Sequence, residues 1–226
     1  KLDIKFDVFD NKLLINNITK LIVDGNIIGW FQGKMEFGPR ALGNRSIIAD
    51  PRIHDMQKRL NLKIKYRESF RPFAPSVLLD FAKIYFDLNN ESPYMLFAKD
   101  LQKEFLIEND KAIESNGVDR VNNIRSNVPA VTHLDNSCRV QTVSKERNLL
   151  FHQLLTSFYQ NTGCPMLINT SFNVRGEPIV CTPEEALRCF YNTDMDILVL
   201  GDCVINKKYN KKETSKLFLR SLLIED

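Results

Sequence analysis

The chain has 226 residues, of which 43% are hydrophobic and 26% are charged, and its formal net charge at pH 7 is +3. These values are typical of a globular protein that buries a core, and they exclude a low-complexity chain. The net charge is too small to indicate by itself that the protein binds nucleic acid. No apolar run approaches the about 18 residues that a membrane-spanning helix needs, and the five cysteines form no C-x-x-C pair, so a disulfide scaffold or zinc ribbon is disfavoured and a reducing cytoplasm is the simplest compartment.

The spacing of apolar residues predicts strands and helices that alternate along the chain, which is the α/β class. In chain order we expect a helix over 11–24, strands over 27–32 and 45–49, a helix over 53–65, strands over 73–79, 128–134 and 139–143, a helix over 146–160, a strand over 166–169, a helix from 182 and a strand over 197–200. The helix at Thr182 has a clear start, because Pro183 fits the first helical position and Glu185 can complete a capping box.

No linker or internal repeat divides the sequence, so we expect one domain over residues 1–226. Between about 81 and 127 the pattern weakens, and pairs such as Asn89-Asn90 interrupt it repeatedly. We therefore expect an irregular insertion or lid over that range. The lysine-rich tail over 207–226 is expected to be exposed.

The first candidate site is a glycine-rich segment over residues 29–46, which holds four glycines and the cations Lys34, Arg40 and Arg45. Glycines let backbone amides approach a ligand closely, and cations beside them suit a phosphate or carboxylate. The sequence from Gly29 to Pro75 contains ten cationic and four acidic residues. This local excess of positive charge suits a polyphosphate or an RNA backbone as ligand. A basic face that water simply solvates stays open as an alternative.

The second candidate cluster contains Lys65, Arg67 and Arg71, which follow the end of the expected helix and enter a turn stiffened by proline. Cations favour a helix C-terminus for reasons unrelated to any ligand, and that explanation covers Lys65. It explains Arg71 less well, because Arg71 lies between two phenylalanines and a proline.

The third cluster is a polar loop over residues 169–178, directly after a strongly apolar strand. Ser171 and Asn173 offer short donors and acceptors, and Arg175 offers a planar fork of N–H groups. Because α/β proteins place ligands at the carboxyl ends of strands, we interpret this loop as part of a binding site rather than an ordinary turn.

Familiar nucleotide and catalytic motifs are missing from the sequence. It has no P-loop pattern, no G-x-G-x-x-G and no H-x-x-x-H pair. Cys164 with His133 or His152 is a conceivable nucleophile and base, but the local sequence gives it no support, since buried thiols are usually inert.

These segments resemble the C-terminal domain of the NodU/CmcH/TobZ-type O-carbamoyltransferases. The resemblance rests on residues 29–46, 67–76 and 169–183, and it extends from about residue 12 to residue 206. It implies a YrdC-like fold, a twisted mixed sheet with flanking helices. YrdC proteins carry a K-x-R and an S-x-N motif, and Lys65 to Arg67 and Ser171 to Asn173 resemble both.

The resemblance also implies a reaction. Such domains use ATP and carbamoyl phosphate to form carbamoyl-adenylate and release pyrophosphate, and a second domain passes the carbamoyl group to a hydroxyl acceptor. Mg²⁺ is expected with ATP, although no protein ligand for it can be named. The matching positions are Arg40, Lys65 and Arg71 as catalytic residues, with Arg67, Arg139, Ser171, Asn173 and Arg175 as further ligands of ATP or carbamoyl-adenylate.

Two features depart from the family pattern. Asn136 stands where a glycine is usual and Cys138 where a smaller residue is usual, which weakens the assignment of Arg139. The family's N-terminal domain, with its histidine-ligated iron and acceptor site, has no counterpart here, so we expect a fragment or a chain that acts with that domain as a separate partner.

Two other functions remain open at this stage. A YrdC-like basic surface suits an RNA-binding module, although nucleic acid is the less favoured partner, and a regulatory domain would bind a nucleotide without turning it over. Salt dependence separates the first alternative from an ATP pocket, because RNA binding through many phosphates weakens steeply with salt.

Overall fold

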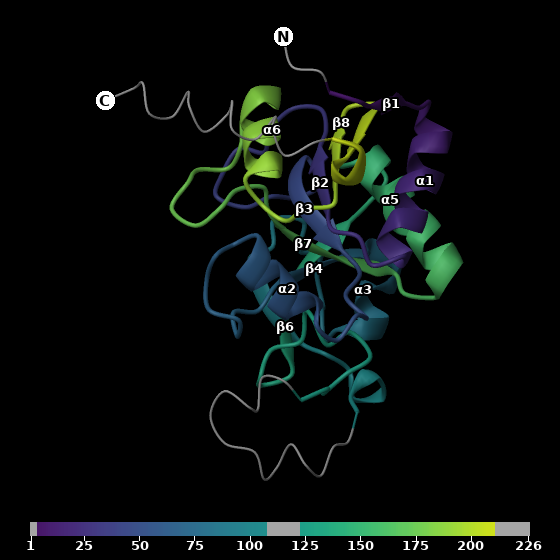
Figure 1. Cartoon of the computed structure of the whole chain (residues 1–226). Helices are drawn as coiled ribbons and strands as arrows, with labels where there is room; N and C mark the ends of the chain where they lie inside the picture. Colours follow the sequence, from purple (N-terminus) through teal and green to yellow (C-terminus); the bar gives the residue numbers. More distant parts are fainter. Residues whose placement is uncertain (1–3, 108–122, 211–226) are drawn as a thin grey trace.

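The computed structural model describes residues 4–107 and 123–210 and is built around a nine-stranded sheet (Figure 1). The strand order is β1-β9-β8-β2-β3-β7-β4-β6-β5. Pairs β2–β8 and β4–β6 are parallel and the others are antiparallel, so the sheet is mixed. The strands are β1 (Asp7–Val8), β2 (Ile28–Phe31), β3 (Arg45–Ala49), β4 (Ala74–Leu78), β5 (Phe97–Asp100), β6 (Ser137–Val143), β7 (Met166–Ser171), β8 (Ile197–Leu200) and β9 (Cys203–Asn206).

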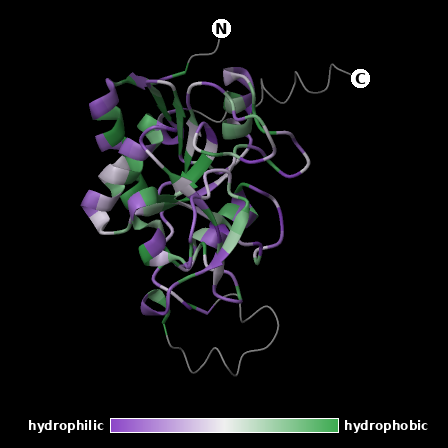
Figure 2. Cartoon of the chain, turned by 180° about the vertical axis from the view of Figure 1, so that it is seen from behind, coloured by the Kyte–Doolittle hydropathy of each residue, from purple (hydrophilic) through white to green (hydrophobic). Residues whose placement is uncertain are grey.

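Helices cover both faces of this sheet. They are α1 (Asn11–Val23), α2 (Met56–Lys63), α3 (Leu79–Tyr85), α5 (Leu149–Thr162) and α6 (Pro183–Tyr191), with short 3-10 turns η1 (Lys103–Phe105) and η3 (Lys207–Tyr209). Helices α1 and α5 pack side by side on one face, where Thr19 donates a hydrogen bond of 2.9 Å to Ser157, and α6 and α2 lie on the other side (Figure 1). The central strands are mostly hydrophobic and the helices show hydrophilic outer faces, which places the core between the layers (Figure 2).

Most expected elements are confirmed, including the α/β class. The helix at Pro183 begins with the full capping box. The Thr182 hydroxyl accepts a hydrogen bond from the backbone N–H of Glu185, and the Glu185 carboxylate accepts one from the backbone N–H of Thr182. The expected strand over 128–134 is wrong: those residues form turns, and Val131 N donates to Val128 O instead of to a neighbouring strand. Residues 139–143 do form a strand as part of β6, which pairs with β4 and β5.

Among the described residues, the strands β1, β5 and β9 and the helix α3 were not expected from the sequence. Of these, α3 and β5 bear on the range 81–127, which also contains η1, so that range holds more regular structure than its sequence pattern indicates. Residues 108–122 of the expected insertion, and 211–226 of the expected tail, lie outside the described residues.

Gly43 fixes the glycine-rich segment against the core, because its φ is +109° and a Cβ placed there would lie 2.4 Å from the ring of the fully buried Phe151. We expect Gly43→Ala to lower the free energy of unfolding by about 2 to 3 kcal/mol, through both overpacking and backbone strain. Urea denaturation measures the change. The control is Gly33→Ala, where φ is +47° and no atom lies within 4 Å of the added methyl group. Equal losses in both variants would contradict the packing explanation.

Candidate functional site

The register of the central strands brings the candidate segments together at one end of the sheet. Ser46 at the start of β3 lies opposite Ser171 at the end of β7, and Ala74 at the start of β4 lies opposite Asn169. In the parallel pair β4–β6, Ser76 is aligned with Gln141, which brings Arg139 to the level of Ala74. The loops after α2 and β7 lie on the side of the sheet away from α1 and α5 (Figure 1), whereas the glycine-rich segment also contacts the start of α5, where Asn148 donates to Oδ1 of Asn44.

A cavity of about 110 Å³ lies where these segments meet. Arg40, Arg67, Arg139 and Ser171, four of the residues expected to bind a ligand, line it together with Asn169. None of the described residues that line the cavity is acidic. The structure therefore brings three guanidinium groups from three separate segments to one small space.

The electrostatics of the cavity favour an anion. Burial lowers the pKa of Arg139, and the neighbouring charge of Arg40 lowers it further. Burial likewise lowers the pKa of Arg67, with contributions from Arg71 and Arg139 that outnumber the opposing contribution of Glu68. Nε of Arg139 is buried and has no hydrogen-bond partner among the residues described. An anion that binds between these arginines would reduce their mutual repulsion and accept a hydrogen bond from the unused Nε.

Arg67 is held in place by the residues around it. Its Nε donates a hydrogen bond of 2.6 Å to Oδ1 of Asn61, and its guanidinium lies 4.9 Å from the ring centre of Phe73. Asn61 is fully buried on α2 and also donates to two carbonyls of the following loop, those of Ser69 and Arg71. The arginine is thus pre-oriented at the cavity, and ordering it on binding costs little conformational entropy.

Lys65 does not line the cavity, although the sequence places it in the same motif as Arg67. It is 4% exposed, and its Nζ donates to the carbonyl of Ser171, to the carbonyl of Asn173 at 2.9 Å and to Oδ1 of Asn173 at 2.8 Å. Burial lowers the pKa of Lys65 to about 7, with a smaller contribution from Arg67. The amine therefore connects the end of α2 to the loop after β7.

The loop after β7 is also closed on itself. The Ser171 hydroxyl donates to Oδ1 of Asn173 at 2.8 Å, and Nδ2 of Asn173 donates to the carbonyl of Glu177 at 2.8 Å. Between them Phe172 is fully buried and its backbone N–H bonds the carbonyl of Arg45. The two expected ligands, Ser171 and Asn173, therefore bond each other and Lys65 in this structure.

Arg71 and Arg175 lie outside the cavity, where Glu68 connects them. Nε of Arg71 is 3.3 Å from one carboxylate oxygen of Glu68, and Nη1 of Arg175 is 3.9 Å from the other. A hydrogen bond with its own backbone, together with Arg71 and Arg175, holds the pKa of Glu68 below its usual value. All three side chains are exposed, so these ion pairs contribute little to stability. They do show that the two arginines reach the same anionic group.

The glycine-rich segment uses several of its own polar groups internally. Oε1 of Glu36 accepts from the backbone amides of Leu42 and Asn44 at 2.7 Å and of Arg45 at 3.2 Å. A carboxylate of the same segment therefore occupies these three amides, so they are not free for a ligand in this structure. Arg45 is 5% exposed and donates to the carbonyls of Gln32 and Gly33, so it holds the turn together.

Asn169 is a cavity residue that the sequence placed in the third cluster without giving it a role. It belongs to a buried polar network in which its Nδ2 donates to Ala41 O at 3.1 Å, to Ser76 Oγ at 2.9 Å and to Gln141 Oε1 at 2.8 Å. The signal in the sequence was weak: Asn169 is the first polar residue after an apolar run, but only the sheet register shows that it is central.

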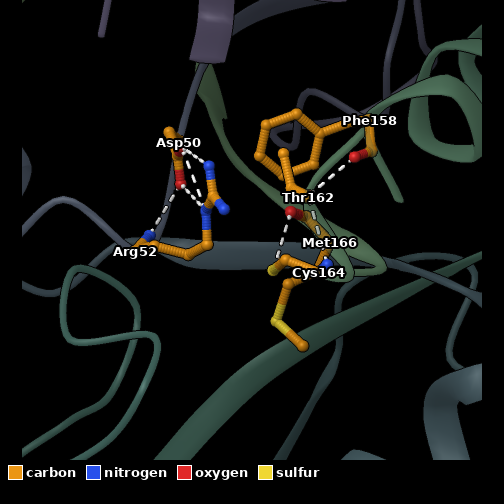
Figure 3. Close-up of polar contacts among 6 residues, drawn as sticks. All are labelled: Asp50, Arg52, Phe158, Thr162, Cys164 and Met166. Carbon is orange, nitrogen blue, oxygen red and sulfur yellow. Dashed lines mark hydrogen bonds and ion pairs between the residues drawn. The ribbon is translucent and has the colours of Figure 1, made fainter. Parts of the chain in front are cut away.

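Among the described residues, neither His133 nor His152 makes a hydrogen bond to the conceivable nucleophile Cys164. Burial raises its pKa to about 12, and its Sγ lies 3.6 Å from the carbonyl of Met166, which accepts its weak hydrogen bond (Figure 3). The nearby ion pair of Asp50 with Arg52, at 2.6 Å, is structural, with Asp50 1% exposed (Figure 3). His133 bonds Ser137 instead. A thiol in these surroundings stays protonated at neutral pH.

The two departures from the family pattern leave Arg139 in place. Asn136 has a φ of +65°, the left-handed conformation that glycine favours and asparagine tolerates. Cys138 is fully buried, and burial raises its pKa to about 12. Because side chains alternate along a strand, Cys138 and Arg139 point to opposite faces of β6.

The described residues offer neither a membrane-spanning helix nor a cluster of metal ligands. None of the helices among them combines the length and apolar character needed to cross a bilayer. Within residues 4–107 and 123–210, no three His, Cys, Asp or Glu side chains gather in a way that could hold a metal ion.

Comparisons with known proteins place this arrangement among related sequences. Residues 19–207 match the family described as Carbamoyltransferase C-terminus. An uncharacterized protein of Synechocystis sp. is 53% identical over 203 residues, covering 89% of this chain and 33% of that protein. The 3'-hydroxymethylcephem-O-carbamoyltransferase of Streptomyces clavuligerus is 33% identical over 186 residues, covering 82% of this chain and 31% of the enzyme. The chain thus spans about a third of the length of these relatives.

Among solved structures, full-length HypF in its phosphate- and nucleotide-bound form is similar to this chain with a TM-score of 0.51. The match covers 84% of this chain and 25% of HypF at 16% sequence identity. At that identity the likeness concerns the fold, and it confirms the expected YrdC-like arrangement of a mixed sheet with flanking helices.

Proposed function

Because this chain belongs to the Carbamoyltransferase C-terminus family, we propose that it binds ATP and carbamoyl phosphate and forms carbamoyl-adenylate for transfer to a hydroxyl acceptor. The observation that carries the proposal is the convergence of Arg40, Arg67 and Arg139 on one cavity without an acidic side chain. Both proposed substrates are phosphate anions, and guanidinium groups recognise phosphate oxygens with paired N–H donors.

We assign the two substrates to an inner and an outer site according to the size of the cavity. A volume of about 110 Å³ is small beside the about 300 to 1,000 Å³ of clefts that bind drug-sized ligands. It suits the carbamoyl end of carbamoyl phosphate and is too small for a nucleotide. The exposed pair Arg71 and Arg175 lies outside it and suits the triphosphate of ATP. HypF, whose fold this chain shares, has been solved with phosphate and nucleotide bound.

The reaction needs positioning and charge stabilisation rather than a side-chain nucleophile. Water first releases inorganic phosphate from carbamoyl phosphate and leaves carbamate. A carbamate oxygen then forms a bond to the α-phosphorus of ATP while the bond from that phosphorus to the bridging oxygen breaks, and pyrophosphate leaves with the electron pair. Negative charge builds up on the phosphate oxygens during the second step, where fixed arginines stabilise it most. Lys65 acts as a positioning residue that holds the loop carrying Asn173 and Arg175.

The described residues do not provide a metal site of their own. No group of three carboxylate, histidine or cysteine side chains gathers among them, and the arginines at the cavity repel a cation. Mg²⁺ would therefore come with the phosphates of ATP, and we derive no step through it. The transfer to the acceptor would require an N-terminal metal-binding domain, joined to this chain or supplied as a separate protein.

The proposal is tested by the pyrophosphate that the chain produces. We expect pyrophosphate and AMP-derived product from ATP and magnesium only when carbamoyl phosphate is present. ATP binding without pyrophosphate under any condition would point to a regulatory nucleotide-binding domain. Failure to bind ATP at millimolar concentration would overturn the proposal.

A salt titration of the same sample separates ATP binding from RNA binding. RNA contacts many phosphates, so its affinity should fall steeply with salt and should survive the loss of any one arginine. An ATP site that uses Arg71 should instead lose most of its affinity when Arg71 alone is replaced.

A further inference from the structure

The side chain of Asn169 is fixed in one orientation by backbone carbonyls. Gln141 Nε2 donates to the carbonyl of Leu42 at 2.9 Å, which leaves Gln141 Oε1 as an acceptor. Asn169 Nδ2 donates to that oxygen at 2.8 Å and to the carbonyl of Ala41 at 3.1 Å. Because a carbonyl can only accept, neither amide can be turned over without losing these bonds.

This orientation leaves one polar atom of the network unused. Asn169 lines the cavity and is 1% exposed. Its Oδ1 is buried and has no hydrogen-bond partner among the described residues. A buried acceptor without a donor costs about 1 to 3 kcal/mol. The same cavity is also lined by the cationic donors of Arg40, Arg67 and Arg139, including the unused Nε of Arg139.

The cavity lining therefore combines the unused neutral acceptor of Asn169 with cationic donors. Inorganic phosphate satisfies the arginines and, as an anion rich in acceptors, offers Asn169 little. A carbamoyl group carries two N–H donors and a carbonyl oxygen on one carbon, so it can satisfy the acceptor and the donors together. An acetyl group has the same shape, with a methyl group in place of the NH₂, and leaves the acceptor unpaired.

We propose that Oδ1 of Asn169 accepts a hydrogen bond from the NH₂ of the carbamoyl group and so selects carbamoyl phosphate over acyl phosphates of the same shape. The inference rests on the proposed function and adds a specificity-determining residue to it. The NH₂ is present in carbamoyl phosphate, in carbamate and in carbamoyl-adenylate, so one contact holds the group throughout the reaction. Asn169 takes no proton and forms no bond to the reacting atoms.

The test compares the affinities of the full 226-residue chain for carbamoyl phosphate, acetyl phosphate and inorganic phosphate, by calorimetry in the cold. We expect carbamoyl phosphate to bind about five-fold to about a hundred-fold more tightly than acetyl phosphate, the range that one unsatisfied buried acceptor gives. Asn169→Ala should bring the two affinities together and leave inorganic phosphate binding nearly unchanged.

Ser76→Ala is the matched control, because Ser76 is fully buried and bonds Asn169 Nδ2 but does not line the cavity. It should keep the preference for carbamoyl phosphate, whereas a purely structural role of the network would reduce the preference in both variants. Equal binding of the two acyl phosphates by the unaltered chain would overturn the inference and leave the proposed function standing, and it requires no variant to fold. Binding of neither would overturn both.

Discussion

Lys65→Met is expected to lower the affinity for ATP about a hundred-fold and the free energy of unfolding by about 2 to 4 kcal/mol. The methionine fills the space but leaves the carbonyls of Ser171 and Asn173 buried without their donor. Without that bond the loop that carries Arg175 loses its fixed position. Calorimetric titration with ATP and urea denaturation measure the two effects separately.

Lys63→Met is the matched control for this variant. Lys63 lies two residues earlier, at the exposed end of α2, and its replacement should change stability by no more than about 0.5 kcal/mol. If both variants bind ATP as the unaltered chain does, Lys65 does not position the loop.

The pH dependence of stability gives a further readout of Lys65. Its pKa is about 7 in the folded chain against 10.5 for an ordinary lysine, so between these values the unfolded chain binds more protons than the folded one. Stability contributed at this residue therefore rises as pH increases through that window and is lowest below about pH 7. The difference in unfolding free energy between the unaltered chain and Lys65→Met should grow from pH 7 to pH 10, and a constant difference would show that the amine stays charged.

Arg139→Ala is expected to reduce carbamoyl-phosphate-dependent pyrophosphate formation by at least about a hundred-fold, since it removes a buried cation from the cavity. Its stability should be unchanged or slightly higher, because the substitution relieves the burial and the repulsion from Arg40 that lower the pKa of Arg139. Loss of activity without loss of stability is typical of a residue kept for function. Steady-state kinetics and thermal unfolding of the same sample test the combination.

The variant Arg139→Lys separates the effect of the positive charge of Arg139 from the effect of its planar guanidinium geometry. It keeps the charge but not the planar fork, so activity should recover only in part. The control is the exposed Arg147, which does not line the cavity and whose Nη2 lies 3.5 Å from Oε2 of Glu91. Its replacement should leave activity unchanged. Full recovery in Arg139→Lys would mean that only the charge matters.

The sequence predicts the parts of the fold whose signals are local. The capping box at Thr182 and the apolar strand over Ile197–Leu200 need no tertiary information, and both were found. The strands β1 and β5 are too short to show an alternation of apolar and polar residues that the sequence could reveal. They form strands because they pair with β9 and β6. The segment 128–134 has the composition of a strand, but its hydrogen bonds are made within its own turns.

The candidate site was predicted in composition but not in geometry. The cation-rich segments indicated Arg40 and Arg67, the family resemblance added Arg139, and the sheet register brings all three to one cavity. Neither the segments nor the resemblance could show that Lys65 turns inward to bond Ser171 and Asn173, because that depends on where the chain goes after α2. The role of Asn169 was missed for a similar reason, since its unused oxygen becomes evident only when its neighbours on β4 and β6 are known.

The most direct test of the account is the exchange of labelled pyrophosphate into ATP by the isolated chain. An enzyme that forms an adenylate reversibly rebuilds ATP from that adenylate and the labelled pyrophosphate. We predict that label enters ATP only when carbamoyl phosphate is present, and that Arg139→Ala abolishes the exchange. Label that enters ATP equally well without carbamoyl phosphate, or no exchange from a chain that binds both substrates, would contradict the account.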